Sequence, residues 1–163
     1  MTSDEFAEQV IDMLRETPLQ AGEDWPDMLF LQRDGQLAGV AEFHPGCYHH
    51  GKLHEDAVAS AAMNLHAERV ALVNMGWLSE IANRELEAAR DSGDRDYRFH
   101  ADDRPDRVEL LMVAVVDATS ATGYTAKVIR DALGFASLGE FQSGPTRGRL
   151  VDPLRAAFVA RTN

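Results

Sequence analysis

The sequence has little of what stabilises secreted proteins or anchors membrane proteins. Cys47 is the single cysteine among 163 residues, which excludes an internal disulfide framework. No apolar run approaches the roughly 20 residues that a helix needs to cross a bilayer. The N-terminus also carries no series of charged, apolar and small residues of the kind found in signal peptides. These absences predict a cytoplasmic protein that does not bind membranes.

Positive charge is also scarce. The chain holds 16 Lys and Arg against 27 Asp and Glu, for a formal net charge of -11, and only two of the basic residues are lysines. Attraction to phosphates requires positive charge, so this balance disfavours nucleic acid as a partner. The acidity is expected to keep a small protein soluble. An acidic surface for a basic partner and mimicry of a nucleic acid are the alternatives.

The chain lacks the motifs of common catalytic and phosphate-binding sites. There is no GxGxxG after a predicted strand and no GKS or GKT segment. Cys47 beside a histidine has the composition of an activated nucleophile, and His100 with Asp102 and Asp103 that of an imidazole and carboxylate site. Both groups lie in polar segments without a surrounding signature, so we predict no catalytic residues.

The clearest structural feature that the sequence predicts is a β-hairpin. Residues 108–116, VELLMVAVV, are apolar at both parities from Leu110 onward, which is typical of a strand buried on both faces. Residues 124–130 alternate and keep Thr125 and Lys127 polar, and turn-forming residues separate the two segments. The short length and β-branched content of 108–116 favour a strand over a buried helix.

The other elements follow from caps, turns and periodicity. The spacing of Thr2 and Glu5 predicts a capping box at the start of a helix. Asp34-Gly35 between apolar runs predicts a hairpin, and Asp152-Pro153 predicts the first residues of a closing helix. Residues 70–77 favour a strand, with helix as the open alternative.

Together these elements predict one α+β domain over residues 1–163. We expect a mainly antiparallel, five-stranded sheet with flanking helices in the order α-β-β-α-β-(α)-β-β-α. A helix and a polar loop are inserted at 79–107, and an irregular flap is expected at 132–149.

Two resemblances accompany this prediction. The order of elements is similar to that of the profilin-like folds, which include the roadblock and longin modules, and this implies a dimerising or partner-binding platform. The segments at 29–36, 104–117 and 129–134 resemble short uncharacterised proteins of actinobacteria and their phages, which implies no particular activity.

The most unusual chemistry lies in residues 44–54, HPGCYHHGKLH, which the Pro and Gly content predicts to be a loop. Five of its side chains are of the types that bind zinc, namely His44, Cys47, His49, His50 and His54. A single segment supplies only half of a usual tetrahedral site, so His66 or His100 would have to complete it. We therefore predict no cofactor and keep zinc as the alternative, beside a solvated loop and a loop that senses pH or contacts a partner.

A second candidate site is aromatic. Tyr97, Arg98 and Phe99 interrupt the charged segment 91–107, where aromatic side chains have no core of their own to fill. Such residues are often hot spots for binding a partner. The alternative is a loop that folds back on the domain.

These observations favour a small acidic binding module without catalytic activity. It would contact a protein partner or a second copy of itself through its sheet, the 91–107 loop or a strand edge. The alternative is a metal-binding protein or metal-dependent hydrolase that uses residues 44–54. An inhibitor encoded by a phage or another mobile element is a third hypothesis.

Overall fold

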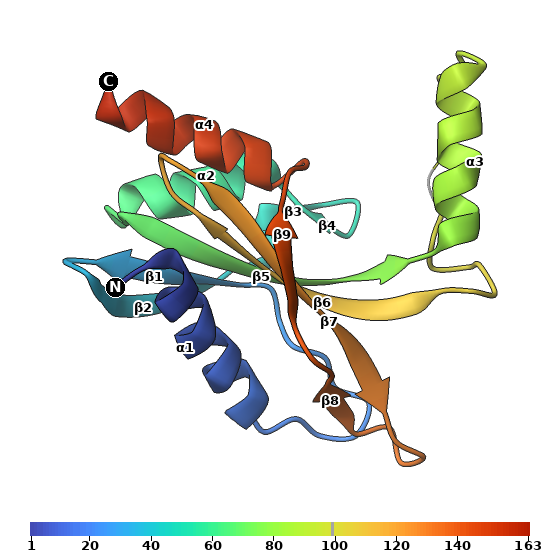
Figure 1. Cartoon of the computed structure of the whole chain (residues 1–163), viewed down its shortest axis with the longest axis horizontal. Helices are drawn as coiled ribbons and strands as arrows, with labels where there is room; N and C mark the ends of the chain where they lie inside the picture. Colours follow the sequence, from blue (N-terminus) through green and yellow to red (C-terminus); the bar gives the residue numbers. More distant parts are fainter. Residues whose placement is uncertain (99) are drawn as a thin grey trace.

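The computed structural model describes residues 1–98 and 100–163 and has the predicted α+β architecture. Within these residues, four α-helices accompany an antiparallel sheet that curls into a half-barrel (Figure 1). In chain order the elements are α1 Ser3–Glu16, β1 Met28–Arg33, β2 Gln36–Glu42, the 3-10 helix η1 Pro45–Cys47, β3 Tyr48–His49, β4 Lys52–Leu53, α2 Glu55–Asn64, β5 Arg69–Leu78, α3 Glu80–Asp91, β6 Val108–Val116, β7 Ala121–Arg130, β8 Ala136–Leu138, β9 Gln142–Pro145 and α4 Val151–Thr162. No helix in these residues is long and apolar enough to cross a bilayer.

The main sheet has seven strands, so the prediction of five is wrong. Its order is β2-β1-β5-β6-β7-β8, and β9 also pairs with β7. The two additional strands, β8 and β9, come from the segment 132–149 that the sequence predicts to be an irregular flap. They are three and four residues long. Hydrogen bonding to two different parts of the long strand β7 makes them strands, and their own sequences show no clear alternation.

The predicted hairpin over 108–130 forms the centre of the sheet. β6 lies between β5 and β7 and pairs with both over most of its length. Residues 69–78 form β5, which confirms the strand where the sequence left helix open. The predicted hairpin turn at Asp34-Gly35 is also confirmed, since both residues have positive φ, 52° and 70°, as a type I′ turn requires.

Helices pack on both faces of the sheet. α1 packs Phe6 and Leu14 on one face, and α2 and α4 pack Val58 and Phe158 on the other. Successive side chains of β5 and β6 alternate between the two cores. This explains why residues 108–116 are apolar without interruption.

α3 stands away from this body at the far end of β5 and β6 (Figure 1). It begins after Ser79, and no helix or strand is present in the described residues between its end and β6. The predicted insertion at 79–107 is therefore a projection from the sheet, and we call residues 79–107 the arm.

The closing helix begins earlier than predicted. α4 starts at Val151, so Asp152 and Pro153 lie in its first turn rather than at the cap and first position. Asp152 Oδ1 accepts a hydrogen bond from Gly148 N at 3.2 Å. The aspartate thus fixes the turn before the helix instead of capping the helix itself.

Candidate functional site

The His-rich segment 44–54 is a short helix followed by a hairpin, so its prediction as a loop is wrong. His49 lies opposite Lys52 in the β3–β4 pair, and His50-Gly51 form the turn with φ of 50° and 74°. The alternation directs Leu53, 4% exposed, into the core beside α2. His49 and Lys52 therefore lie on the outer face of this hairpin.

The five candidate metal ligands make different contacts. The Nδ1 atoms of His44 and His54 each accept a hydrogen bond from a backbone N–H two residues on, at 3.1 and 3.2 Å, and so cap the helices η1 and α2. Cys47 packs against the core, and the rings of His49 and His50 lie 4.2 Å apart. Over residues 1–98 and 100–163, no three His, Cys, Asp or Glu side chains converge as metal ligands would. Completion of such a site by His66 or His100 thus has no support in the geometry.

Tyr97 folds back on the arm. Its hydroxyl lies 3.4 Å from Ala82 O and 3.3 Å from Glu85 Oε2, both on α3. Arg104 Nη2 donates to the same carboxylate at 2.5 Å. Arg98 is exposed, and Phe99 lies outside the described residues. Tyr97 therefore packs within the arm, and its role in binding a partner stays a prediction.

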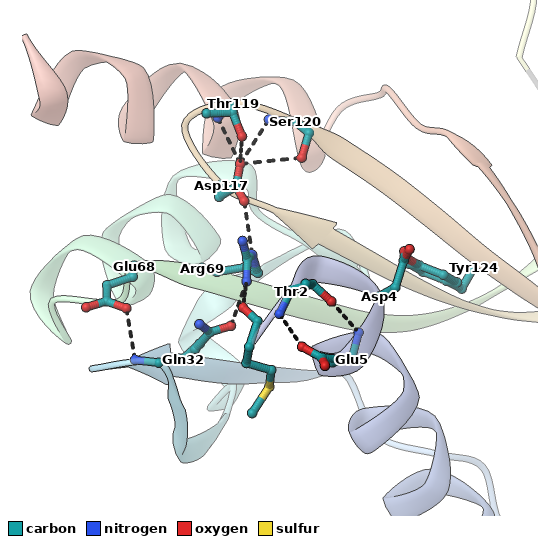
Figure 2. Close-up of polar contacts among 12 residues, drawn as sticks. Thr2, Asp4, Glu5, Gln32, Glu68, Arg69, Asp117, Thr119, Ser120 and Tyr124 are labelled. Carbon is teal, nitrogen blue, oxygen red and sulfur yellow. Dashed lines mark hydrogen bonds and ion pairs between the residues drawn. The ribbon is translucent and has the colours of Figure 1, made fainter.

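A polar cluster at the start of β5 binds distant segments together. Figure 2 shows Arg69 between Asp117 and Gln32, with Nε donating to Asp117 Oδ2 at 3.0 Å and Nη1 donating to Gln32 Oε1 at 2.9 Å. Asp117 Oδ1 also accepts hydrogen bonds from Thr119 N, Thr119 Oγ1 and Ser120 N, at 2.8, 2.7 and 2.9 Å. Burial acts to raise the pKa of Asp117, but the hydrogen bonds from Thr119, Arg69 and Ser120 outweigh it and keep that pKa below its usual value. The Asp117 carboxylate is held by hydrogen bonds from other residues of the chain, so we assign it a role in stability.

The sheet face under α2 and α4 is covered over only part of its length. Beyond Leu72 and Ala114 the same face continues through side chains that lie outside the helix-covered core. We call this set the open face, and it consists of Asn74, Gly76, Leu78, Leu110, Met112, Thr125, Lys127 and Ile129. Leu78 is 43% exposed and Ile129 is 55% exposed, which is high for large aliphatic side chains of a sheet.

The open face is hollowed and contains a hydrogen-bond acceptor that receives no hydrogen bond within the described part of the chain. Two adjoining hollows of about 200 and 450 Å³ lie over it and share Leu78, Leu110 and Thr125. Asn74 Oδ1 is buried and receives no hydrogen bond from the described residues. A buried polar atom without a partner costs roughly 1–3 kcal/mol. A bound molecule with a donor at this point would remove that cost.

Sequence reasoning named the sheet as a contact surface but did not locate the open face on it. Its apolar residues have the pattern of ordinary buried strands, so the sequence alone places them in the core. The signal that could have shown otherwise is length, because helices of 10 and 12 residues extend about 15–18 Å, whereas a strand of 10 residues extends about 33 Å. Two such helices leave one end of the long strands uncovered.

Comparison with known proteins leaves the function to be inferred from this geometry. No protein-family model, no curated protein and no solved structure matches the chain. The resemblances to profilin-like folds and to actinobacterial proteins therefore stay predictions.

Proposed function

We propose that the protein is a non-catalytic binding module whose open face receives an amphipathic helix of a partner protein. One observation carries this proposal. The core surface under α2 and α4 continues into a part that no helix of the described residues covers, and Leu78 and Ile129 are exposed there. Exposed large apolar side chains on a hollowed surface are typical of helix-binding grooves.

The dimensions of the open face suit one helix. It spans three strands that lie about 4.8 Å apart and about four residues of each strand at about 3.3 Å per residue, hence roughly 10 by 13 Å. A helix with its side chains is about 10 Å in diameter. On the neighbouring part of the same face, α2 and α4 pack against each other and on the strands. The open face is thus a continuation of a surface that already accommodates helices.

The side chains of the open face define the partner helix further. Leu78, Leu110 and Met112 favour apolar residues spaced i, i+3 and i+4 along one side of that helix. Asn74 Oδ1 favours a hydrogen-bond donor among them. Lys127, exposed at the rim, favours a carboxylate on the flanking turn.

A second copy of this chain is a poor source of that helix. Each of the four helices in the described residues already buries apolar side chains in its own fold, namely Phe6, Ala7, Val10 and Leu14 of α1, Val58 and Ala62 of α2, Ala82 and Ala89 of α3, and Val151, Leu154 and Phe158 of α4. Presenting them to a neighbour would first require local unfolding. We therefore assign the helix to a different protein.

Gly76→Leu tests the proposal because it fills the groove without disturbing the fold. A Cβ at Gly76 would meet no atom within 4 Å, so the new side chain projects into open space. A displayed library of amphipathic helical peptides is selected on the wild-type protein, and the selected peptides are measured against Gly76→Leu. We expect at least a tenfold loss of affinity. Gly39→Leu is the matched control, since a Cβ at this strand glycine of β2 also meets nothing within 4 Å.

The alternatives give different results in the same experiment. Peptides that bind Gly76→Leu and wild type equally, or a library that yields no binder, would overturn the proposal. A wild-type dimer that Gly76→Leu dissociates in light-scattering measurements would show that a second copy occupies the open face, which also contradicts the assignment to a different protein.

A further inference from the structure

We propose a second site, a cleft between the β3–β4 hairpin and the arm that binds a small aromatic phosphate of the mononucleotide class. The cleft has a volume of about 480 Å³ and is lined by Lys52, Trp77, Arg98, His100, Ala101 and Asp102. The lining comes from β4, from the end of β5 and from the arm, so only the folded chain creates the cleft. None of the open-face residues lines it, although Trp77 borders both this cleft and the smaller hollow over the open face.

The first argument is local charge. Lys52 and Arg98 line the cleft in a chain whose net charge is -11, and neither forms an ion pair within the described residues. Both side chains are exposed and gather at the same hollow, where they suit an anion from outside the chain. Asp102 is the opposing charge on the lining.

An adjoining hollow shares Lys52 with the cleft. It has a volume of about 400 Å³ and runs from Lys52 past three imidazoles to Arg149, lined by His49, His50, Lys52, His54, Glu55 and Arg149. Arg149 Nη1 pairs with Glu55 Oε2 at 3.0 Å. A backbone hydrogen bond and, after it, this contact with Arg149 keep the pKa of Glu55 below its usual value. The carboxylate of this hollow is thus neutralised within the chain. Lys52 stands where the two hollows meet, at the position best placed for a phosphate.

The second argument is the exposed indole. Trp77 is 42% exposed, whereas the other tryptophan, Trp25, is 5% exposed in the core. The guanidinium of Arg107 lies 5.1 Å from the centroid of the Trp77 ring, and Arg107 Nη1 donates to Asp102 O. Arg107 therefore connects the Trp77 ring to Asp102, another residue of the lining. A planar base can stack in such a place regardless of its identity, while its phosphate binds Lys52 and Arg98.

The overall charge favours a small anion over a polymer. Lys52 and Arg98 against Asp102 leave one net positive charge on the lining, which suits a single phosphate, whereas each further phosphate of a strand would approach a surface of net negative charge. A mononucleotide should therefore bind more tightly than a short oligonucleotide.

Tryptophan fluorescence provides a direct measurement. The wild-type protein is titrated at low salt with AMP, with adenosine and with inorganic phosphate. We expect AMP to change the emission saturably and adenosine to bind at least tenfold more weakly. Trp77→Phe should abolish the response while the emission of Trp25 remains. Lys52→Ala and Arg98→Gln should each weaken AMP binding about tenfold.

Matched controls exist for both basic residues. Lys127→Ala removes the only other lysine, on the open face, and Arg95→Gln removes an exposed arginine of the arm outside the lining, so both variants should bind AMP as the wild type does. Equal affinities for AMP and adenosine, a response that survives Trp77→Phe, a loss in the control variants or no binding at all would overturn the proposal. Tighter binding of a short oligonucleotide would also overturn it, in favour of nucleic acid. Lys52 and Arg98 line neither hollow of the open face, so the result for Lys52→Ala and Arg98→Gln tests the cleft separately from the proposed function.

Discussion

At the scale of single residues, Asp117 joins the turn between β6 and β7 to Arg69, 48 positions away in the chain. Asp117 is 12% exposed and Arg69 is 18% exposed, so solvent screens their contact only weakly. Gln32 and the backbone oxygen of Met1 also accept from Arg69, at 2.9 and 3.0 Å. One guanidinium therefore fixes three segments at this end of the sheet.

Asp117→Asn should lower the free energy of unfolding by about 2–4 kcal/mol, because it leaves the mostly buried Arg69 without its counter-charge. Urea titration followed by circular dichroism measures the change. Asp12→Asn, an exposed residue on α1, is the control and should change stability by less than about 0.5 kcal/mol.

The pH dependence of the same pair has a definite sign. The folded-state pKa of Asp117 is lowered, so its contribution to stability is present above the unfolded-state pKa of about 3.9 and is lost as the pH falls through the folded-state pKa. The stability difference between wild type and Asp117→Asn should therefore be constant from pH 7 to 5 and shrink below about pH 4. A difference that grows on acidification would contradict the assigned role.

Residue types alone do not show which contacts the side chains of segment 44–54 make. Its histidines and Cys47 match a list of zinc-binding types, but two of the imidazoles cap helices and the thiol packs against the core. Which side chains converge depends on the path of the backbone, which composition does not contain.

At the scale of elements, the arm has little support from the rest of the molecule. Ser79, 1% exposed, anchors it: Oγ accepts from Ala82 N at 3.0 Å and donates to Asp106 Oδ1 at 2.6 Å, and Asp106 Oδ2 accepts from Ile81 N at 3.2 Å. The hydrogen bond from Ser79 also lowers the pKa of Asp106. The start of α3 is thus tied to the segment that leads into β6.

Ser79→Ala should destabilise α3 locally by about 1–2 kcal/mol through loss of the N-cap. Hydrogen exchange should show faster exchange of α3 amides with little change in the central strands, because the arm stands apart from the body. Ser92→Ala at the other end of α3, where Oγ donates to Ala89 O at 3.1 Å, is the control with a smaller expected effect. Uniformly faster exchange throughout the sheet would show that the arm and the body are one cooperative unit.

Elements with local signals were predicted well, and those without them were not. The capping box at Thr2 and Glu5 and the Asp34-Gly35 turn are both present, because the bonds that define them lie within a few residues. β8 and β9 depend on partners in β7, and the hairpin at His50-Gly51 has a less usual turn sequence than Asn-Gly or Asp-Gly. The missed elements were thus those that depend on distant pairing or on an uncommon turn.

At the scale of the whole molecule, the two cores share the strands between them. Phe6 is 0% and Phe158 1% exposed, and they lie in the cores on opposite faces of the sheet. Loss of one core should therefore destabilise the other.

Phe158→Ala should lower the free energy of unfolding by about 3–5 kcal/mol. In a Trp77→Phe background, fluorescence of Trp25 reports on the core on the other face. Its unfolding transition should shift together with the transition seen by circular dichroism. Phe135→Ala, at a residue 45% exposed beside β8, is the control and should have an effect below about 1 kcal/mol. Separate transitions in Phe158→Ala would show that the two cores unfold independently.

The sequence by itself determined the α+β class, the central hairpin, the first helix and the turn between β1 and β2, because alternation, caps and turn residues act over short distances. Only the tertiary structure decided how many strands join the sheet, where α2 and α4 stop covering it, and which of the charged side chains lack partners. These features depend on segments far apart in the chain meeting in space. Both proposed sites are of this second kind, since each is formed by strands and loops that only folding brings together.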